Sequence, residues 1–136
     1  MVEKKNQLSG TNKNVRAVKI TSTNAINKAD LEKRCPIAFT IAVIGGRWRL
    51  SILALLRDYG SLRYSSIRSK LPNITERMLT MQLKSLEHFG LITKRIYAEV
   101  PTRVEYALSE KGNSLGSILH EMTKWGEHHY DEYHNS

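Results

Sequence analysis

The sequence predicts a small, mainly α-helical fold with one β-hairpin. Apolar residues recur every three or four positions in several segments, as they do along the buried face of a helix. Between residues 92 and 108 they instead alternate with polar residues, which is the period of a β-strand. A chain of 136 residues with 40% hydrophobic content amounts to about one domain with a modest core.

Two helices are predicted before residue 60. The first ordered element begins near Cys35-Pro36, because proline is well tolerated at the first helical position, and Gly45-Gly46 ends it. The second helix covers residues 47–57 and is closed by Asp58-Tyr59-Gly60. Its apolar positions, spaced by three and four, are Trp48, Ile52, Leu55 and Leu56.

A compact pair of helices follows. Residues 61–63 are predicted as a short strand and residues 64–71 as a helix, with Pro72-Asn73 as the turn after it. Thr75 is expected to cap the next helix, because its side-chain oxygen accepts a hydrogen bond from an otherwise unpaired N–H. Glu76 in the first turn complements the helix dipole.

The helix that begins after Thr75 is predicted to have a buried apolar face and a polar, positively charged face. At about 100° per residue, two groups of side chains fall on opposite sides. The apolar stripe consists of Leu79, Leu83 and Leu86. The opposite face consists of Arg77, Met81 and Lys84, with Thr80 and Ser85 beside them.

The remainder of the chain is predicted as a hairpin and a long helix. After Gly90, which can end a helix in the left-handed conformation, residues 91–97 and 102–108 form a two-stranded ribbon. A last helix runs from about residue 109 or 110 to about residue 130. Its apolar stripe consists of Leu115, Ile118, Leu119, Met122, Trp125 and His129.

We predict a disordered basic arm over residues 1–28, one domain over residues 29–132 and a short tail over residues 133–136. The arm is rich in Lys, Asn, Ser and Thr and lacks a continuous apolar segment, unlike a signal peptide. The longest apolar run, residues 37–44, is far shorter than the about 20 residues of a membrane span. We therefore expect a soluble, cytoplasmic protein, and the single cysteine, Cys35, fits a reducing cytosol.

The formal net charge of +8 at pH 7 is unevenly distributed. Residues 1–34 carry +5, residues 35–108 carry +6 and residues 109–136 carry −3. This distribution favours a body that faces a polyanion and a C-terminal segment with another role.

The order of helix, turn, helix and hairpin is that of a winged helix-turn-helix, whose second helix fits the ~12 Å major groove of DNA. Arg77 and Lys84 are predicted to donate hydrogen bonds to phosphates or to guanine. Thr80 and Met81 are predicted to contact a thymine methyl group, and Thr75 begins the same surface. The alternative is that Arg77 and Lys84 only keep an exposed helix soluble.

The hairpin would be the wing, which lies along the neighbouring minor groove, where arginine is favoured. Arg103 is predicted to enter that groove, with Lys94 and Arg95 contacting the DNA backbone. The alternative is that Arg103 pairs with Glu105 or Glu99 and only stabilises the ribbon. Two further candidates for phosphate contacts are Arg63 and Ser65.

Four short motifs occur at separate places in the chain. They are Cys35-Pro36-Ile37 leading to Gly45-Gly46-Arg47-Trp48, then Ile74-Thr75-Glu76-Arg77-Met78-Leu79, then Glu99-Val100-Pro101-Thr102-Arg103-Val104-Glu105-Tyr106, and finally Leu108-Ser109-Glu110-Lys111-Gly112. Together they closely resemble the HxlR-type winged helix-turn-helix family, over about residues 31–128. The resemblance implies a bacterial or archaeal transcriptional regulator that is a small homodimer, with the first and last helices at the subunit interface.

On that basis, the candidate interface residues are Ile37, Ile41, Leu115, Ile118, Leu119, Met122 and Trp125. The final stripe agrees with a dimer, because a small body cannot cover all of it and an exposed apolar patch marks an interface. Two subunits related by a two-fold axis would place their recognition helices about 34 Å apart, on an inverted-repeat operator. The alternative is that the stripe packs inside one subunit.

Cys35 is a candidate sensor. It precedes Pro36 at a predicted helix N-terminus beside Lys33 and Arg34, and both the helix dipole and the cations favour the reactive thiolate. In the resembling family, a cysteine at this position serves some members as a sensor of oxidants or of electrophiles such as quinones and aldehydes. A small-molecule or oxidant effector follows from this role, and the alternative is a small buried residue without signalling function.

The sequence contains no nucleophile motif, phosphate-binding glycine loop or paired carboxylates. Adjacent His128 and His129 point about 100° apart on a helix, which argues against a closed metal site. We therefore predict no enzyme, no metal and no cofactor. Rival functions are a winged-helix module that binds DNA without sequence preference or binds protein, and a small catalytic or metal-dependent domain.

Overall fold

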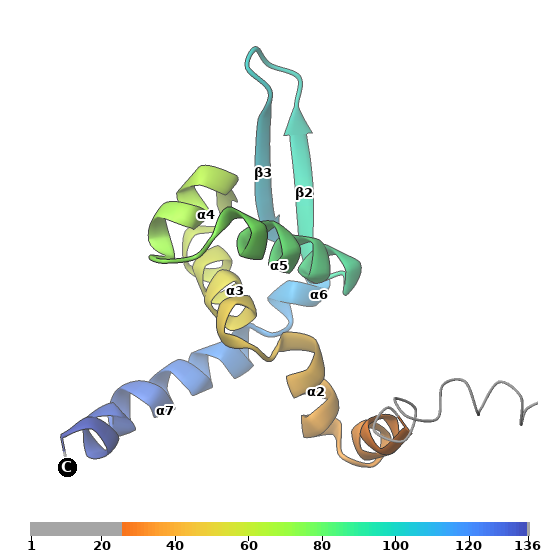
Figure 1. Ribbon diagram of the computed structural model, residues 1–136, viewed down its shortest axis with the longest axis vertical. Helices are drawn as coiled ribbons and strands as arrows, with labels where there is room; N and C mark the ends of the chain where they lie inside the picture. The colour runs from red at the N-terminus through yellow and green to blue at the C-terminus, as the bar shows by residue number, and fades with distance from the viewer. Residues whose placement is uncertain (1–25, 136) are drawn as a thin grey trace, which may run out of the picture. The chain divides into compact units, whose positions relative to one another are not determined.

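The computed structural model, drawn in Figure 1, describes residues 26–135. The chain divides into two compact units, one that ends at Val43 and one that begins at Ile44. In the first unit, the described residues 26–43 are helical except for Cys35. The second contains five helices and three strands within its described residues, and its order of elements is that of a winged helix-turn-helix. The predicted fold class, mainly α-helical with a small antiparallel wing, is confirmed.

The first unit contains a helical segment that the sequence analysis did not predict. Residues 26–34 are helical and precede α2 (Pro36–Ile44), whereas the first ordered element was expected near Cys35-Pro36. Spacing of opposite charges by four residues supports this segment, because Lys28 lies 4.0 Å from Glu32 and Asp30 lies 3.1 Å from Arg34. Of the predicted arm, residues 26–28 are therefore helical, and residues 1–25 lie outside the described residues.

The second unit begins with α3 (Arg47–Tyr59), β1 (Ser61–Arg63) and α4 (Tyr64–Lys70). It continues with α5 (Glu76–His88), the strands β2 (Ile92–Tyr97) and β3 (Arg103–Leu108), and the helices α6 (Glu110–Asn113) and α7 (Gly116–His134). The predicted short strand, compact helix and hairpin are all present. Figure 1 shows the hairpin extending beyond α4 and α5.

The sheet has three antiparallel strands in the order β1-β3-β2, so the predicted two-stranded ribbon gains β1 as a third strand. Leu62 of β1 lies opposite Tyr106 of β3, and Arg95 of β2 lies opposite Glu105 of β3. Because β1 leads directly into α4, the sheet ties the first helix of the helix-turn-helix to the base of the wing.

The core of the second unit is a packed set of aliphatic side chains from the last residue of α2, from α3, α4 and α5, and from the sheet. Its fully buried members are Ile44, Ile52, Leu53, Leu56, Ile67, Leu79, Leu83 and Leu86. Leu53 is completely buried although the predicted stripe of α3 omitted it, whereas the predicted Trp48 and Leu55 are only half-buried. The buried face of α3 is therefore shifted toward Leu53 relative to the predicted stripe, and Ile52, Leu53 and Leu56 together span about 100° of its circumference.

Tyr106 is the one aromatic side chain in this core, at 7% exposure. Burial raises the pKa of its hydroxyl above the ordinary value, and the nearby Glu87 and Tyr64 act in the same direction. Stability linked to this raised pKa is fully present below about pH 10 and is lost as the pH rises through the folded-state value.

The last helix is interrupted, where one continuous helix was expected from residue 109 or 110 to residue 130. Ser109 caps α6 by accepting a hydrogen bond from the Gly112 N–H at 2.9 Å, and Leu115 bonds back to Gly112 instead of continuing the α-helical pattern. Gly112, Asn113 and Ser114 are poor helix formers, which favours the break. The second piece, α7, runs on to His134.

Within residues 26–135, no single helix has the length and apolarity needed to cross a membrane, although α2 and α3 counted together reach them with a break between the two.

Gly112 of α6 is closely packed, and its substitution tests this packing. A Cβ at Gly112 would collide with the carbonyl oxygen of Leu91, whereas a Cβ at Gly126 in α7 would meet open space. Gly112→Ala is expected to lower the free energy of unfolding by about 1–3 kcal/mol, as overpacking does. The matched variant Gly126→Ala is expected to raise it by roughly 0.5–1 kcal/mol through helix propensity. Urea unfolding followed by circular dichroism measures both, and equal stability of the two variants would contradict the packing of α6.

Candidate nucleic-acid interface

The helix α5 begins at a well-formed cap. Thr75 is extended, and its Oγ1 accepts a hydrogen bond from the Met78 N–H at 3.1 Å, which confirms the predicted cap. The preceding turn contains Asn73 in the left-handed conformation, with φ of 72°. Asparagine tolerates this conformation better than most residues, so the turn and the cap together set the direction of α5.

The two faces of α5 separate as the periodicity predicts. Leu79, Leu83 and Leu86 are at most 2% exposed. Arg77, Thr80, Met81 and Lys84 are exposed on the other side. Within residues 26–135, neither Arg77 nor Lys84 has an ion-pair partner, so both charges are available to a ligand. The predicted orientation is thus confirmed, and contact with DNA stays a prediction.

These exposed side chains line a shallow depression together with Tyr64 of α4 and Glu76 at the start of α5. Its lining consists of Tyr64, Glu76, Arg77, Thr80, Met81 and Lys84. The Tyr64 hydroxyl lies 3.1 Å from Thr80 Oγ1 and 3.1 Å from the carbonyl oxygen of Glu76. Tyr64 therefore fixes the first turns of α5 against α4.

A second contact joins the same two helices. Arg68 Nη1 of α4 lies 2.7 Å from Oε1 of Glu76 in the first turn of α5. Neither Tyr64 nor Arg68 was predicted from the sequence as a site residue, although their spacing of four residues places them on one face of α4. The predicted Arg63 and Ser65 lie nearby at the junction of β1 and α4, and both are exposed.

The middle of α5 also contacts α3 through polar side chains. Arg49 donates a hydrogen bond from Nε to Oε1 of Gln82 at 3.2 Å, and its guanidinium lies 5.3 Å from the centre of the Phe89 ring. The Gln82 amide in turn lies 3.3 Å from the sulfur of Met78. These partly buried contacts supplement the leucine packing and restrict rotation of α5 about its axis.

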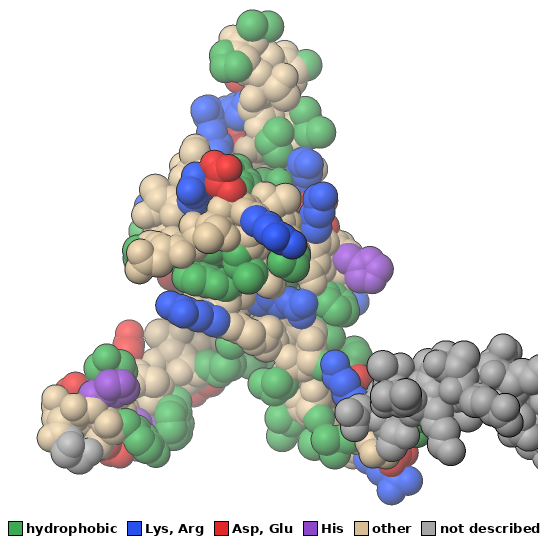
Figure 2. Space-filling model, in the orientation of Figure 1, with side chains coloured by type: hydrophobic (Ala, Val, Ile, Leu, Met, Phe, Trp, Pro, Cys, Tyr) green, Lys and Arg blue, Asp and Glu red, His purple; other side chains and the backbone are tan. Residues whose placement is uncertain are grey.

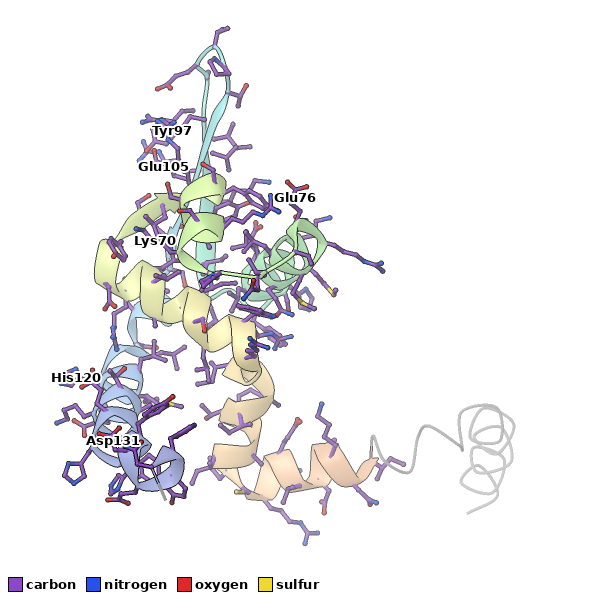
Figure 3. All side chains as sticks on the ribbon, turned by 60° about the vertical axis from the view of Figure 1, so that its left-hand side comes forward. Lys70, Glu76, Tyr97, Glu105, His120 and Asp131 are labelled. Carbon is purple, nitrogen blue, oxygen red and sulfur yellow. The ribbon has the colours of Figure 1, made fainter. Side chains whose placement is uncertain are left out.

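On the wing, Arg103 is engaged with its own hairpin. It forms ion pairs with Glu99 at 3.1 Å and with Glu105 at 3.3 Å, and it lies 3.8 Å from the centre of the Tyr97 ring. Its side chain is 26% exposed. The pairing with Glu99 and Glu105, which the sequence left as the alternative, is therefore present in this structure. Figure 3 shows Tyr97 and Glu105 on the same side of the hairpin.

The other two predicted wing residues are exposed. Lys94 and Arg95 occupy successive positions in β2 and so point to opposite faces of the sheet. Arg95 lies 5.0 Å from the centre of the Tyr97 ring. Figure 2 shows Lys and Arg side chains gathered over α4, α5 and the hairpin, with few acidic side chains among them.

The remaining candidates lie on the terminal helices. Cys35 is half-buried between the helical segment 26–34 and α2, where its carbonyl oxygen accepts a hydrogen bond from Phe39 at 3.3 Å. Most of the candidate interface residues are exposed: Ile37 at 74%, Ile41 at 51%, Ile118 at 42%, Met122 at 41% and Trp125 at 61%. Leu119 is instead buried within its own subunit at 4%, and Leu115 is half-buried.

The histidines of α7 make contacts with neighbouring side chains. His129 lies 3.1 Å from Glu132 and 4.5 Å, between ring centres, from Trp125. Within the described residues, no three His, Cys, Asp or Glu side chains come together in a group that could hold a metal ion.

Comparison with known proteins gives a consistent result. The pattern that describes HxlR-like helix-turn-helix proteins matches residues 43–134. An HTH-type transcriptional regulator of Methanothermobacter thermautotrophicus is 44% identical over 107 residues, which is 79% of this chain and 81% of that protein.

Two solved structures show the same fold. The redox regulator HypR in its reduced form is 40% identical, with a TM-score of 0.70 over 74% of this chain and 99% of that one. The reduced form of the transcriptional regulator YodB from Bacillus subtilis is 33% identical, with a TM-score of 0.60 over 68% of this chain and 91% of that one.

The cap of α5 can be tested by its effect on stability. Thr75→Ala removes the acceptor of the Met78 N–H and is expected to lower the free energy of unfolding by about 1 kcal/mol. Thr75→Ser keeps the oxygen and is expected to restore most of that loss. Chemical unfolding of both variants measures the difference, and an alanine variant as stable as the serine variant would show that the cap does not hold α5.

Proposed function

Because this chain belongs to the HxlR-like helix-turn-helix family of DNA-binding transcriptional regulators, we propose that it acts as a homodimer that recognises a specific operator through α5. The family is one of regulators and not of enzymes. A cytoplasmic location is part of this proposal. One observation carries it: the face of α5 opposite the leucines presents two unpaired cations beside Thr80 and Met81.

This surface suits the major groove of DNA. Arg77 lies in the first turn of α5, and the N-terminal residues of a recognition helix are those that contact base edges. Lys84 lies two turns farther along, where its ammonium suits a phosphate. Between them, Thr80 and Met81 offer methyl groups that fit the methyl group of thymine.

The wing and the start of α4 supply phosphate contacts in this proposal. Exposed Lys94 and Arg95 are suitably placed on β2, and Arg63 and Ser65 at the junction of β1 and α4 are exposed as well. Arg103 has a different role from these phosphate-contacting residues. Because it is already paired with two carboxylates, we assign it to stiffening the wing rather than to entering the minor groove.

Exposed apolar side chains support the homodimer. The faces of α2 and α7 expose Ile37, Ile41, Ile118, Met122 and Trp125, and exposed apolar side chains of this size stabilise an interface when a second subunit covers them. Leu119 belongs to the core of the single subunit and is left out of the proposed interface. Two-fold symmetry then requires an operator with inverted repeats about one helical turn apart.

Binding measurements test this function. Arg77→Ala is expected to weaken binding to a selected operator by roughly 5- to 150-fold, because a good base contact is worth about 1–3 kcal/mol. Lys84→Ala is expected to weaken binding to all DNA alike and to reduce the slope of log affinity against log salt by about 1. Lys111→Ala, an exposed lysine of α6, serves as the matched control and is expected to leave affinity unchanged.

The alternative function, DNA binding without sequence preference, predicts a different result in the same DNA-binding titrations. A winged-helix module that binds DNA without sequence preference would show the salt dependence but no operator preference for Arg77→Ala to remove. Equal affinity of the unaltered protein for selected and scrambled DNA would therefore contradict operator recognition.

We also propose that Cys35 senses oxidants. It is the only cysteine in the chain, it is partly accessible, and it lies immediately before α2. A relative with the same fold, HypR, is described as a redox regulator and has solved structures in reduced and oxidised forms. In the homodimer, oxidation would join the two Cys35 sulfurs in an intersubunit disulfide, with two protons and two electrons passing to the oxidant.

Cys35→Ser tests the sensor. Diamide is expected to change the operator affinity of the unaltered protein by at least severalfold and to produce a dimer on non-reducing gels, whereas the serine variant is expected to show neither effect. Affinity before oxidation should be the same for both proteins. A serine variant that still responds to diamide would exclude Cys35 as the sensor.

A further inference from the structure

Glu76 is an acidic residue on the surface that the proposed function directs at DNA. Its side chain is 70% exposed and lines the same depression as Arg77 and Thr80. Figure 3 shows it at the start of α5, projecting away from the body of the unit. A carboxylate in this place is repelled by the phosphates of DNA, so its presence on this face needs an explanation.

The helix dipole alone explains only part of the environment of Glu76. An acid in the first turn is favoured by the helix dipole whichever way its side chain points. Glu76, however, is held in one direction by Arg68, which comes from the other helix of the helix-turn-helix and lies 2.7 Å from Oε1. The contact is made through Oε1, and within residues 26–135 Oε2 has no hydrogen-bond partner.

The backbone beneath Glu76 is fixed as well. The Tyr64 hydroxyl contacts the Glu76 carbonyl oxygen and Thr80 Oγ1, both at 3.1 Å, so the first turn of α5 is bound to α4 by its backbone and by two side chains. An acceptor presented in this way costs little conformational freedom when it meets a base.

We propose that Glu76 is a specificity-determining residue that selects cytosine in the operator by accepting a hydrogen bond from its N4 amino group, and that Arg68 is the positioning residue that aims the carboxylate. This inference rests on the proposed function, since it assumes that α5 enters the major groove.

Of the four bases, cytosine is the best major-groove partner for a carboxylate. An ionised carboxylate has acceptors only, and cytosine presents only the N4 amino donor in the major groove. Adenine also offers an amino donor, but its N7 acceptor lies beside it and would face a second lone pair of the carboxylate. Guanine and thymine present acceptors there and would repel the carboxylate. The ion pair with Arg68 reduces the repulsion between Glu76 and the phosphates on either side.

The test is a selection of bound sequences from random DNA by the full-length protein and its variants. Unaltered protein is expected to select cytosine at one position of each half-site, with a loss of roughly fivefold or more in affinity when that base is changed. Glu76→Ala is expected to bind all four bases there alike. Glu76→Gln, which adds a donor, is expected to shift the preference to adenine. Base preferences at every other position should stay the same.

Two further measurements separate recognition from structure. N4-methylcytosine, which places a methyl group where the free amino hydrogen lies, is expected to weaken binding by the unaltered protein and not by Glu76→Ala. Arg68→Met is expected to broaden the preference at that one position, and Arg68→Lys to restore it in part. Glu110→Gln removes an exposed carboxylate from the first turn of α6, near the other end of α5, and serves as the matched control. Melting temperatures of all variants report any effect on folding.

These outcomes separate the role of Glu76 from operator recognition itself. If the unaltered protein selects no motif at all, operator recognition itself fails. If it selects a motif and folded Glu76→Ala selects the same motif with the same base at every position, the role of Glu76 is overturned while operator recognition stands.

Discussion

The burial of three leucines of α5 in the core of the second unit is the constraint on which the rest of the site depends. Leu79, Leu83 and Leu86 are nearly inaccessible, and burying side chains of this kind stabilises the fold by about 1.5–3 kcal/mol each. Rotation of α5 about its axis would expose them and bury Arg77 and Lys84 without partners. The same burial that stabilises the domain therefore presents the cationic face outward.

Polar contacts refine the orientation that the leucines set. Thr75 fixes where α5 begins, Tyr64 and Arg68 bind its first turn to α4, and Arg49 holds its middle from α3. The wing is stiffened in a similar way by Arg103 between two carboxylates. Side chains on the exposed face of α5 are thus positioned by neighbouring elements, which is the arrangement expected of a site that discriminates between ligands.

Features governed by local periodicity could be predicted from the sequence, whereas features governed by tertiary contact could not. The cap at Thr75 and the two faces of α5 follow from spacing alone. The close packing of Gly112 against Leu91, which is distant in sequence, and the contact of Arg68 with Glu76 depend on how separate elements meet. The helix over residues 26–34 was not predicted, because the proline at position 36 favours a helix start there and outweighed the charge pairs spaced by four residues.

Methylation protection with dimethyl sulfate tests most directly whether α5 lies in the major groove. The reagent methylates guanine N7 in the major groove and adenine N3 in the minor groove. Our account predicts that the bound protein protects guanine N7 at two places about 10 base pairs apart, and that the protection is lost when the α5 face is altered. Protection confined to adenine N3, with every guanine N7 still reactive, would contradict it.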